Sequence, residues 1–360
     1  MASLPPLVIT TFGILPQLTS LTELFVDANK EVDLIVSPIF HEVWKITGKQ
    51  LRSLRIQCRF ENLDPIALPR SQVLTSLETF SLECTNCHYL GNSCGRTLHP
   101  EKRVPEIVSK FLFPFIIAHQ STLRYVSFQI DCMTFDVTAL LHCLRGMPCL
   151  YSVSFLIPFA PIGRFPFAQG HRLLRAHQSH LRTFDLNFLH QEASTATELF
   201  PWFFGQAWCK VHLPNLRELR IGQAEFGQDF CDYLRLFSSS LVSLTIYDGT
   251  FMYDILQQLG LVLRDFALLR HLELDVYAFS PSALAVLAVN LPQLRSLKLT
   301  HYCIAFDEDK SKQNDTELYR LVRTTAYPLE LNQYLILFAN SSLRPCIHTR
   351  TFFPVGNLCH

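Results

Sequence analysis

Residues 294–299 read Leu-Arg-Ser-Leu-Lys-Leu, and this spacing of large apolar residues recurs ten times along a chain of 360 residues. Successive phrases begin 25 to 35 residues apart, except for 46 residues between the third and the fourth. A period of this length predicts a solenoid, in which each repeat is one supersecondary unit that stacks on its neighbours. The ten phrases begin at Leu21, Leu51, Leu77, Leu123, Leu150, Leu181, Leu216, Leu241, Leu269 and Leu294.

Each phrase ends with the alternation of a strand, so Leu297 and Leu299 should face one way and Lys298 and Thr300 the other. Helical spacing follows between the phrases, and Ser280-Pro281 is typical of a helix start. Parallel strands need such crossover connections. The sequence therefore predicts an α/β leucine-rich-repeat horseshoe, with parallel strands on its concave face and helices on its convex face. The expected helices include Val104–His119, Asp136–Leu144, Phe226–Phe237 and Met252–Phe266.

The repeat pattern also predicts how the chain is divided. We expect a short N-terminal cap over residues 1–14 and about ten repeats over 15–305, with an insertion near 84–101. Residues 306–360 should form a mobile loop, a degenerate repeat and a C-terminal cap, with strand-like residues at Leu335–Phe338. A cap of fourteen residues is thin. We therefore expect the first repeat to fray, or to be covered by a partner or by an upstream domain outside this sequence.

Composition narrows the class of protein. Apolar residues make up 49% of the chain and charged residues 17%, with 31 basic and 31 acidic side chains. This balance argues against nucleic acid as a partner, because phosphate binding draws on clustered Lys and Arg. The longest apolar run, Phe111–Ala118, is too short to span a membrane and contains Pro114. Isolated cysteines without a signal-peptide pattern favour a reduced intracellular location, cytoplasmic or nuclear.

One cluster has metal-ligand chemistry, namely Cys84, Cys87, Cys94 and His99. A competing interpretation makes Cys84 a small buried residue next to the third strand. The string Cys84-Thr-Asn-Cys87-His88 also matches a haem attachment motif, although nothing else in the chain supports a haem. We expect a cysteine-containing loop with no metal and no cofactor, and hence no stoichiometric zinc in the purified protein.

The chain contains none of the common catalytic motifs, such as a P-loop, a Gly-x-Ser-x-Gly or a His-Glu-x-x-His. Its histidines are scattered, and those in or beside expected helices should be exposed or capping. We therefore expect a protein that is not an enzyme. The histidines concerned are His41, His119, His177, His180 and His212.

The predicted concave face is polar without a dominant charge, Thr245 included, which is typical of a protein-binding surface. Aromatic residues gather at its C-terminal repeats, where Tyr277 and Tyr302 each follow a strand leucine by three residues. Tyrosines beside mixed charge are typical of binding hot spots. The alternative, that these tyrosines only cover loops, stays open. The candidate protein-binding residues are Tyr247, Glu273, Asp275, Tyr277, Lys298 and Tyr302.

Residues 291–299, Leu-Pro-Gln-Leu-Arg-Ser-Leu-Lys-Leu, and the similar phrases at 213–221 and 15–24 resemble the repeats of F-box/leucine-rich-repeat proteins, especially the irregular fungal type. The resemblance covers about residues 15 to 300. It implies that the repeats hold a target protein, while an N-terminal F-box recruits a cullin ubiquitin ligase through an adaptor; Leu4-Pro5-Pro6-Leu7 alone is similar to an F-box opening. We expect a non-catalytic protein-binding solenoid, the target-recognition part of an SCF-type ubiquitin ligase receptor. The alternative is a regulatory scaffold of the GTPase-activating or inhibitor-like kind.

Overall fold

The computed structural model describes residues 20–28, 37–66, 68–69, 74–85, 104–131, 135–158, 167–189, 204–222, 227–304, 333–338 and 347–349. The chain divides into two compact units. Unit 1 is Met1–Ser194 and unit 2 is Thr195–His360. Each unit is described by itself.

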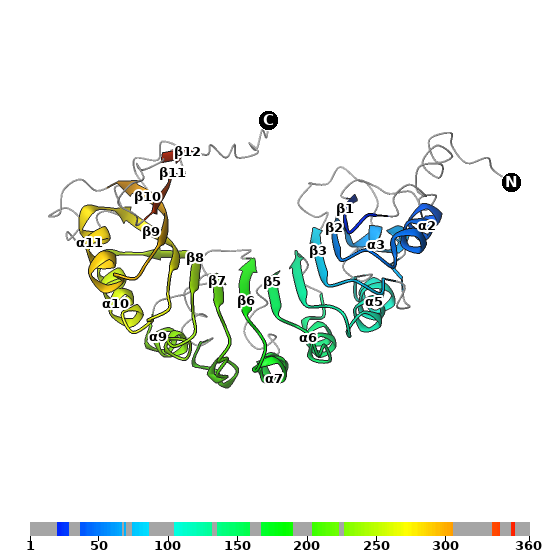
Figure 1. The fold of residues 1–360 in the computed structure, drawn as a ribbon, viewed down its shortest axis with the longest axis horizontal. Helices are drawn as coiled ribbons and strands as arrows, with labels where there is room; N and C mark the ends of the chain where they lie inside the picture. The colour runs from blue at the N-terminus through cyan, green and yellow to red at the C-terminus, as the bar shows by residue number, and fades with distance from the viewer. Residues whose placement is uncertain are drawn as a thin grey trace, which may run out of the picture. The chain divides into compact units, whose positions relative to one another are not determined.

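In unit 1 the described strands form one parallel sheet, in which each strand pairs with the next in sequence (Figure 1). The strands are β1 (Glu23–Ala28), β2 (Ser53–Arg59), β3 (Thr79–Thr85), β4 (Tyr125–Ile130), β5 (Ser152–Pro158) and β6 (Thr183–Leu189). Between them lie α2 (Ser37–Thr47), η3 (Phe60–Asn62), α3 (Leu63–Ile66), α4 (Val104–Ile107), η6 (Val108–Leu112), α5 (Phe113–Ala118), α6 (Val137–Arg145) and α7 (Phe167–His177).

Unit 2 repeats the same alternation of strand and helix. Its parallel strands are β7 (Glu218–Gly222), β8 (Ser243–Phe251), β9 (His271–Phe279) and β10 (Ser296–Ile304), and each pairs with the next. Its described helices include η7 (Ala207–Lys210), α9 (Gln228–Arg235), α10 (Tyr253–Leu263) and α11 (Pro281–Asn290). The expected helices over 104–119, 136–144, 226–237 and 252–266 are thus confirmed to within a few residues, as is the α/β class with parallel strands.

Equivalent positions of successive repeats are paired on neighbouring strands. In unit 1, Leu54 is opposite Leu24 on one side and Phe80 on the other. In unit 2, Leu272 is opposite Leu244 and Leu297. This register places equivalent apolar residues of successive repeats next to one another, so the spacing seen in the sequence becomes a continuous row of core side chains.

A shared backbone contact joins each repeat to the next. The carbonyl of Arg52 accepts hydrogen bonds from the N–H groups of Glu78 and Thr79, at 2.9 Å each. The carbonyl of Arg270 accepts equivalent bonds from Arg295 and Ser296, at 2.8 and 2.9 Å. Because the same carbonyl position is used in repeat after repeat, the backbone itself follows the sequence period, as expected for units that contact mainly their neighbours.

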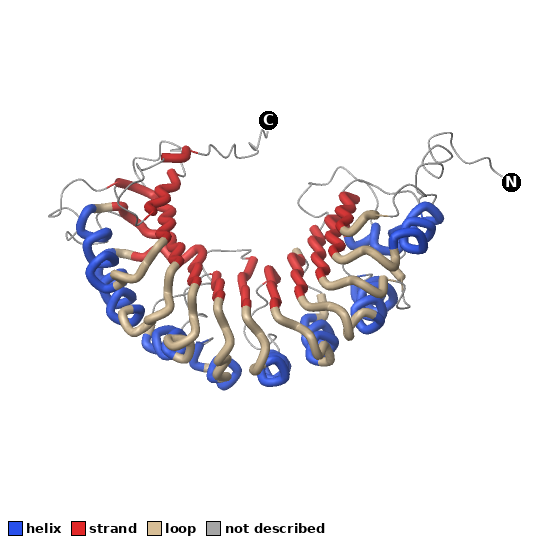
Figure 2. The backbone as a smooth tube through the Cα atoms, viewed as in Figure 1, coloured by secondary structure: helices blue, strands red, loops and turns tan. Residues whose placement is uncertain are grey.

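The core of each unit lies between the sheet and the helices, which cover one face of the strands (Figure 2). In unit 1 the ring of Phe80 is completely buried, 4.8 Å from the ring of Phe115 and 6.0 Å from that of Phe128. Leu244 and Leu274 are likewise fully buried in unit 2. We call the other side of each sheet, which points away from the helices, its open face.

Helix starts follow the local signals in the sequence. The hydroxyl of Ser280 accepts a 3.1 Å hydrogen bond from the N–H of Ala283, and Pro281 occupies the first turn of α11. The carboxylate of Asp136 accepts a 3.0 Å bond from Ala139 at the start of α6. These caps satisfy N–H groups that would otherwise lack an intrahelical partner.

The parallel array ends differently from the expected degenerate repeat. A strand forms at the predicted place, as β11 (Gln333–Phe338), but it runs antiparallel to β10. It is followed by the antiparallel β12 (Ile347–Thr349). Parallel pairing would be required of a further repeat, so β11 terminates the parallel array instead of extending it. The expected loop at 306–315 and the N-terminal cap over 1–14 lie outside the described residues.

Burial predicts unequal protection along the array. Leu21 and Leu24, the first two anchors of the β1 phrase, are only half-buried, whereas Leu244 and Leu274 are fully buried. We expect the amides of residues 24–26 to exchange with solvent much faster than those of 244–246 and 272–274, because local opening exposes less apolar surface there. Hydrogen exchange read by mass spectrometry measures this directly. Equal protection in all three strands would show that β1 is held as firmly as the central strands.

Candidate functional site

The candidate site is the open face of β8, β9 and β10 in unit 2, which we call the β8–β10 face. The register places Arg220, Thr245, Glu273 and Lys298 opposite one another on β7 to β10. Asp275 and Thr300 are paired two residues further along. The strand pairing thus brings Glu273, Asp275 and Lys298 together, as the sequence predicts.

One ion pair lies on this face and another lies beside it on β7. The Lys298 ammonium donates to the Glu273 carboxylate on the neighbouring strand, and both side chains are partly exposed. The Arg220 guanidinium donates to Glu218 through Nε at 2.8 Å. Partly exposed pairs of this kind add roughly 0–1 kcal/mol to stability. Their main consequence is therefore to fix the side chains in place and to keep the net charge of the face low.

Tyr277 and Tyr302 lie on neighbouring strands. The pairs His301–Val276 and Cys303–Ala278 flank them in the register, so the backbone of Tyr302 lies beside that of Tyr277. Tyr277 is half-buried. The predicted proximity on adjacent strands is thus confirmed for the backbone, while the side chain of Tyr302 lies outside the described part of the structure.

Tyr247 lies at a bulge in β8. Ile246 pairs with Leu274, and the next pair joins Phe251 to Val276, so five steps along β8 match two along β9. Tyr247 is the first residue of this bulge and is half-buried. Bulges redirect side chains and are frequent beside functional sites. Sequence reasoning did not identify it, although Gly249 within a strand pattern is the signal that could have done so.

One predicted surface residue is buried. Thr245 is only 5% exposed, although it belongs to the open side of β8. The register places it between Arg220 and Glu273, whose longer side chains extend on either side of its short one. The assignment of Thr245 to the exposed face is therefore wrong, because burial there depends on the size of the neighbours as well as on strand alternation.

The cysteine cluster is only partly visible. Cys84 lies inside β3, not in the insertion, and is fully buried with its Sγ 3.7 Å from that of Cys58, its register partner on β2. This fits the interpretation of Cys84 as a small core residue. Cys87, Cys94 and His99 lie outside the described residues. Among the residues that are described, no group of three or more His, Cys, Asp or Glu side chains is arranged to hold a metal ion.

Two of the histidines expected to be exposed or capping are buried, and each contacts a carbonyl at a helix end. His119 is fully buried, its Nδ1 bonds the carbonyl of Phe115 at 2.8 Å, and burial lowers its pKa. His177 is 2% exposed, and burial lowers its pKa to about 4. Both lie at helix ends, where a carbonyl supplies the partner that a buried imidazole needs. His41 and His212 are exposed, as expected.

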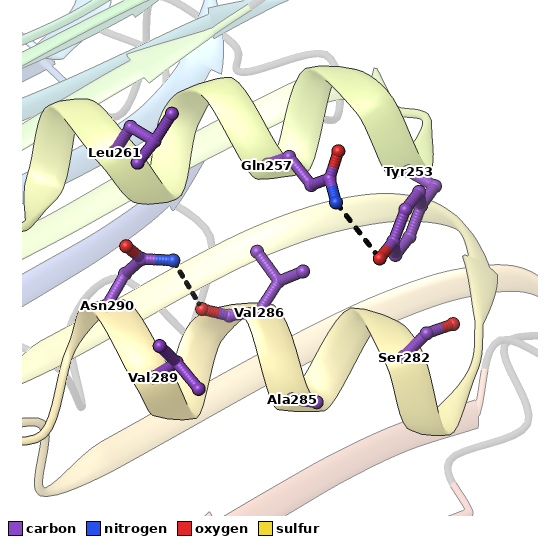
Figure 3. Close-up of a pocket in the computed structure, with 8 residues that line it drawn as sticks. All are labelled: Tyr253, Gln257, Leu261, Ser282, Ala285, Val286, Val289 and Asn290. Carbon is purple, nitrogen blue, oxygen red and sulfur yellow. Dashed lines mark hydrogen bonds between the residues drawn. The ribbon is translucent and has the colours of Figure 1, made fainter.

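On the helical side of unit 2, α10 and α11 enclose a shallow groove of about 570 Å³ (Figure 3). Its most exposed apolar side chains are Leu261, at 54%, and Val289, at 79%. Gly260 lets the two helices approach closely, because a Cβ there would lie 3.1 Å from the side-chain nitrogen of Asn290. This groove was not predicted, although the all-apolar run at 283–289 was a visible signal. Its lining offers no titratable pair for chemistry.

No protein-family model matches the sequence, and no characterised protein gives a significant sequence match. Within the described residues, no helix combines the length and the apolar character needed to cross a membrane. The fold by itself defines the class of this protein as α/β, built from repeated strand–helix units with parallel strands.

Proposed function

We propose that this chain is a non-catalytic protein-binding solenoid of the leucine-rich-repeat type. Its partner would contact the β8–β10 face. The observation that carries the proposal is the convergence of Tyr247, Tyr277 and the Lys298–Glu273 pair on adjacent strands, while the described helices of unit 2 cover the other side of the sheet. Aromatic side chains among fixed charges are the usual anchors of protein interfaces.

Two features support a rigid recognition surface over a catalytic one. Each strand is tied to its neighbour by regular backbone bonds, so the side chains on the open face are preorganised. The charged groups of Lys298 and Glu273 on this face are engaged with each other. Binding proteins gain affinity from such rigidity because fewer side chains lose freedom on association.

The resemblance of residues 213–221 and 291–299 to F-box/leucine-rich-repeat proteins extends the proposal. On that basis, the bound partner would be a target delivered to a cullin ubiquitin ligase. Proximity labelling in the native cell, with and without proteasome inhibition, separates this role from that of a scaffold. A ligase receptor should label the cullin adaptor, together with a target that accumulates on inhibition; a scaffold should label a partner whose amount does not change.

Site-specific photo-crosslinking tests the binding surface itself. A photoreactive phenylalanine analogue at Tyr277 should capture a partner, whereas the same analogue at Leu261, on the helical side, should not. The captured protein should be lost when Lys298→Glu breaks the pair with Glu273 and reverses the charge of the face. Capture from Leu261 alone would move the binding surface to the helices and refute the proposal.

A further inference from the structure

Two histidine rings form a hydrogen-bonded chain at the end of α7 in unit 1. His177 Nε2 lies 3.0 Å from the carbonyl oxygen of Leu144, the next-to-last residue of α6. Nδ1 of the same ring lies 3.1 Å from Nε2 of His180. His180 Nδ1 in turn lies 3.2 Å from the hydroxyl of Ser179. The chain thus runs from a partly exposed turn to a buried carbonyl of the preceding repeat.

One carbonyl sets the direction of every bond in this chain. A carbonyl oxygen only accepts, so Nε2 of His177 must carry a proton and donate to Leu144. In the neutral ring Nδ1 is then an acceptor, and His180 must donate to it through Nε2. Nδ1 of the neutral His180 therefore accepts from the hydroxyl of Ser179. Both imidazoles are held as the Nε2–H tautomer.

The pair can hold one extra proton but not two. A proton added at His180 Nδ1 is accommodated when the Ser179 hydroxyl turns from donor to acceptor, and every contact is kept. A second proton must go to His177 Nδ1. Two N–H groups would then face each other across the 3.1 Å contact, which has to open.

Aromatic and basic side chains also occur around the pair. Tyr151 packs edge-on against the ring of His180, with ring centroids 6.2 Å apart, and the guanidinium groups of Arg124 and Arg182 lie 5.9 and 5.4 Å from the Tyr151 ring. Further basic groups occupy the last turns of the two helices that the chain joins. They are His142 and Arg145 of α6 and Arg175 of α7.

We propose that His177 and His180 form an acid-sensitive latch that holds the end of α7 against α6 and opens when both rings are protonated. The latch is closed at neutral pH and with one proton. The latch lies within unit 1, so its test does not depend on binding at the β8–β10 face of unit 2. In the folded state burial lowers the pKa of His177 to about 4, below the ordinary value of 6.5. The contribution of the neutral ring to folding stability is therefore fully present above pH 6.5. That contribution is lost as the pH falls from 6.5 to about 4.

A variant without the titrating ring tests the latch. His177→Gln keeps an amide that donates to Leu144 and an oxygen that accepts from His180, but it does not titrate. The folding equilibrium of the full chain is measured by urea unfolding at pH 7.5 and pH 4. Between pH 7.5 and pH 4 the folding equilibrium constant of wild type should fall about 100-fold further than that of the variant. Proton linkage predicts this difference from the lowered pKa of His177. His41→Gln, at an exposed position of α2, should behave like wild type.

Imidazole nitrogen chemical shifts of the wild-type protein provide a measurement that does not depend on any variant. They should show both rings as Nε2–H tautomers at pH 7.5, and His177 should remain neutral to below pH 5. In hydrogen exchange at pH 4, α7 should lose more protection than α10 of unit 2. Titration of His177 near pH 6.5 would overturn the proposal, as would an equal pH dependence of wild type and His177→Gln.

Discussion

Phe80→Ala is expected to lower the free energy of unfolding by about 3–5 kcal/mol, the usual effect of removing a buried aromatic ring. Phe80 has no solvent exposure, and its ring contacts the rings of Phe115 and Phe128 from a helix and from the next strand. Truncation to Ala leaves a cavity between the sheet and the helices, because the close-packed side chains around it cannot move far enough to fill the space. Urea unfolding followed by circular dichroism should show the midpoint of unit 1 reduced by roughly 1 M or more.

Phe25→Ala is the matched control, because it removes the same ring from the open face of the same sheet. Phe25 is 55% exposed, and the Arg55 guanidinium lies 5.5 Å above its ring. Its loss should cost less than about 1 kcal/mol, the scale of an exposed cation–π contact. If the two variants unfolded at the same urea concentration, the assignment of Phe80 to the core and of Phe25 to the open face would be wrong.

The double substitution Tyr277→Ala/Tyr302→Ala should weaken partner binding by about 2 kcal/mol or more, which is roughly 30-fold in Kd. The two residues lie on adjacent strands beside Asp275 and the Lys298–Glu273 pair. The loss should appear mainly as faster dissociation. Binding of the partner captured by photo-crosslinking can be measured by surface plasmon resonance, and the melting temperature should change little.

Phe25→Ala/Tyr125→Ala is the control for this experiment, because it removes two exposed aromatic rings from the open face of unit 1. Partner affinity should then stay within about threefold of wild type, since rim and remote contacts contribute little. If the Tyr277/Tyr302 variant bound the partner with wild-type affinity and kept its melting temperature, these tyrosines would not be part of the binding surface. If only the control variant lost affinity, the binding surface would lie on the open face of unit 1.

Some features of the site could be predicted because they depend on spacing alone. The distance of three residues from Leu274 to Tyr277 equals that from Leu299 to Tyr302, and parallel pairing in register converts this equality into adjacency. The Lys298–Glu273 pair follows from the same register. The β8 bulge could not be predicted in this way, because it changes the number of residues on one strand relative to its partner.

Buried histidines show the limit of sequence reasoning most clearly. His177 lies beside exposed residues in sequence, and its helical position predicted an exposed or capping role. Its partner is the carbonyl of Leu144, 33 residues earlier, in the preceding repeat. For His177 the carbonyl that accepts the hydrogen bond belongs to another repeat, and no local pattern reports it. The same holds for Thr245, which is shielded by neighbours from other strands.

The sequence by itself determined the repeat length, the strand and helix positions, the in-register stacking and the cap at Ser280. Each of these depends on residues within one repeat or on a fixed spacing between repeats, so local geometry is sufficient. Tertiary structure alone decided that His177 and Thr245 are buried and that β11 turns antiparallel to β10. These features depend on contacts between residues from different repeats, whose free energies a one-dimensional pattern does not contain.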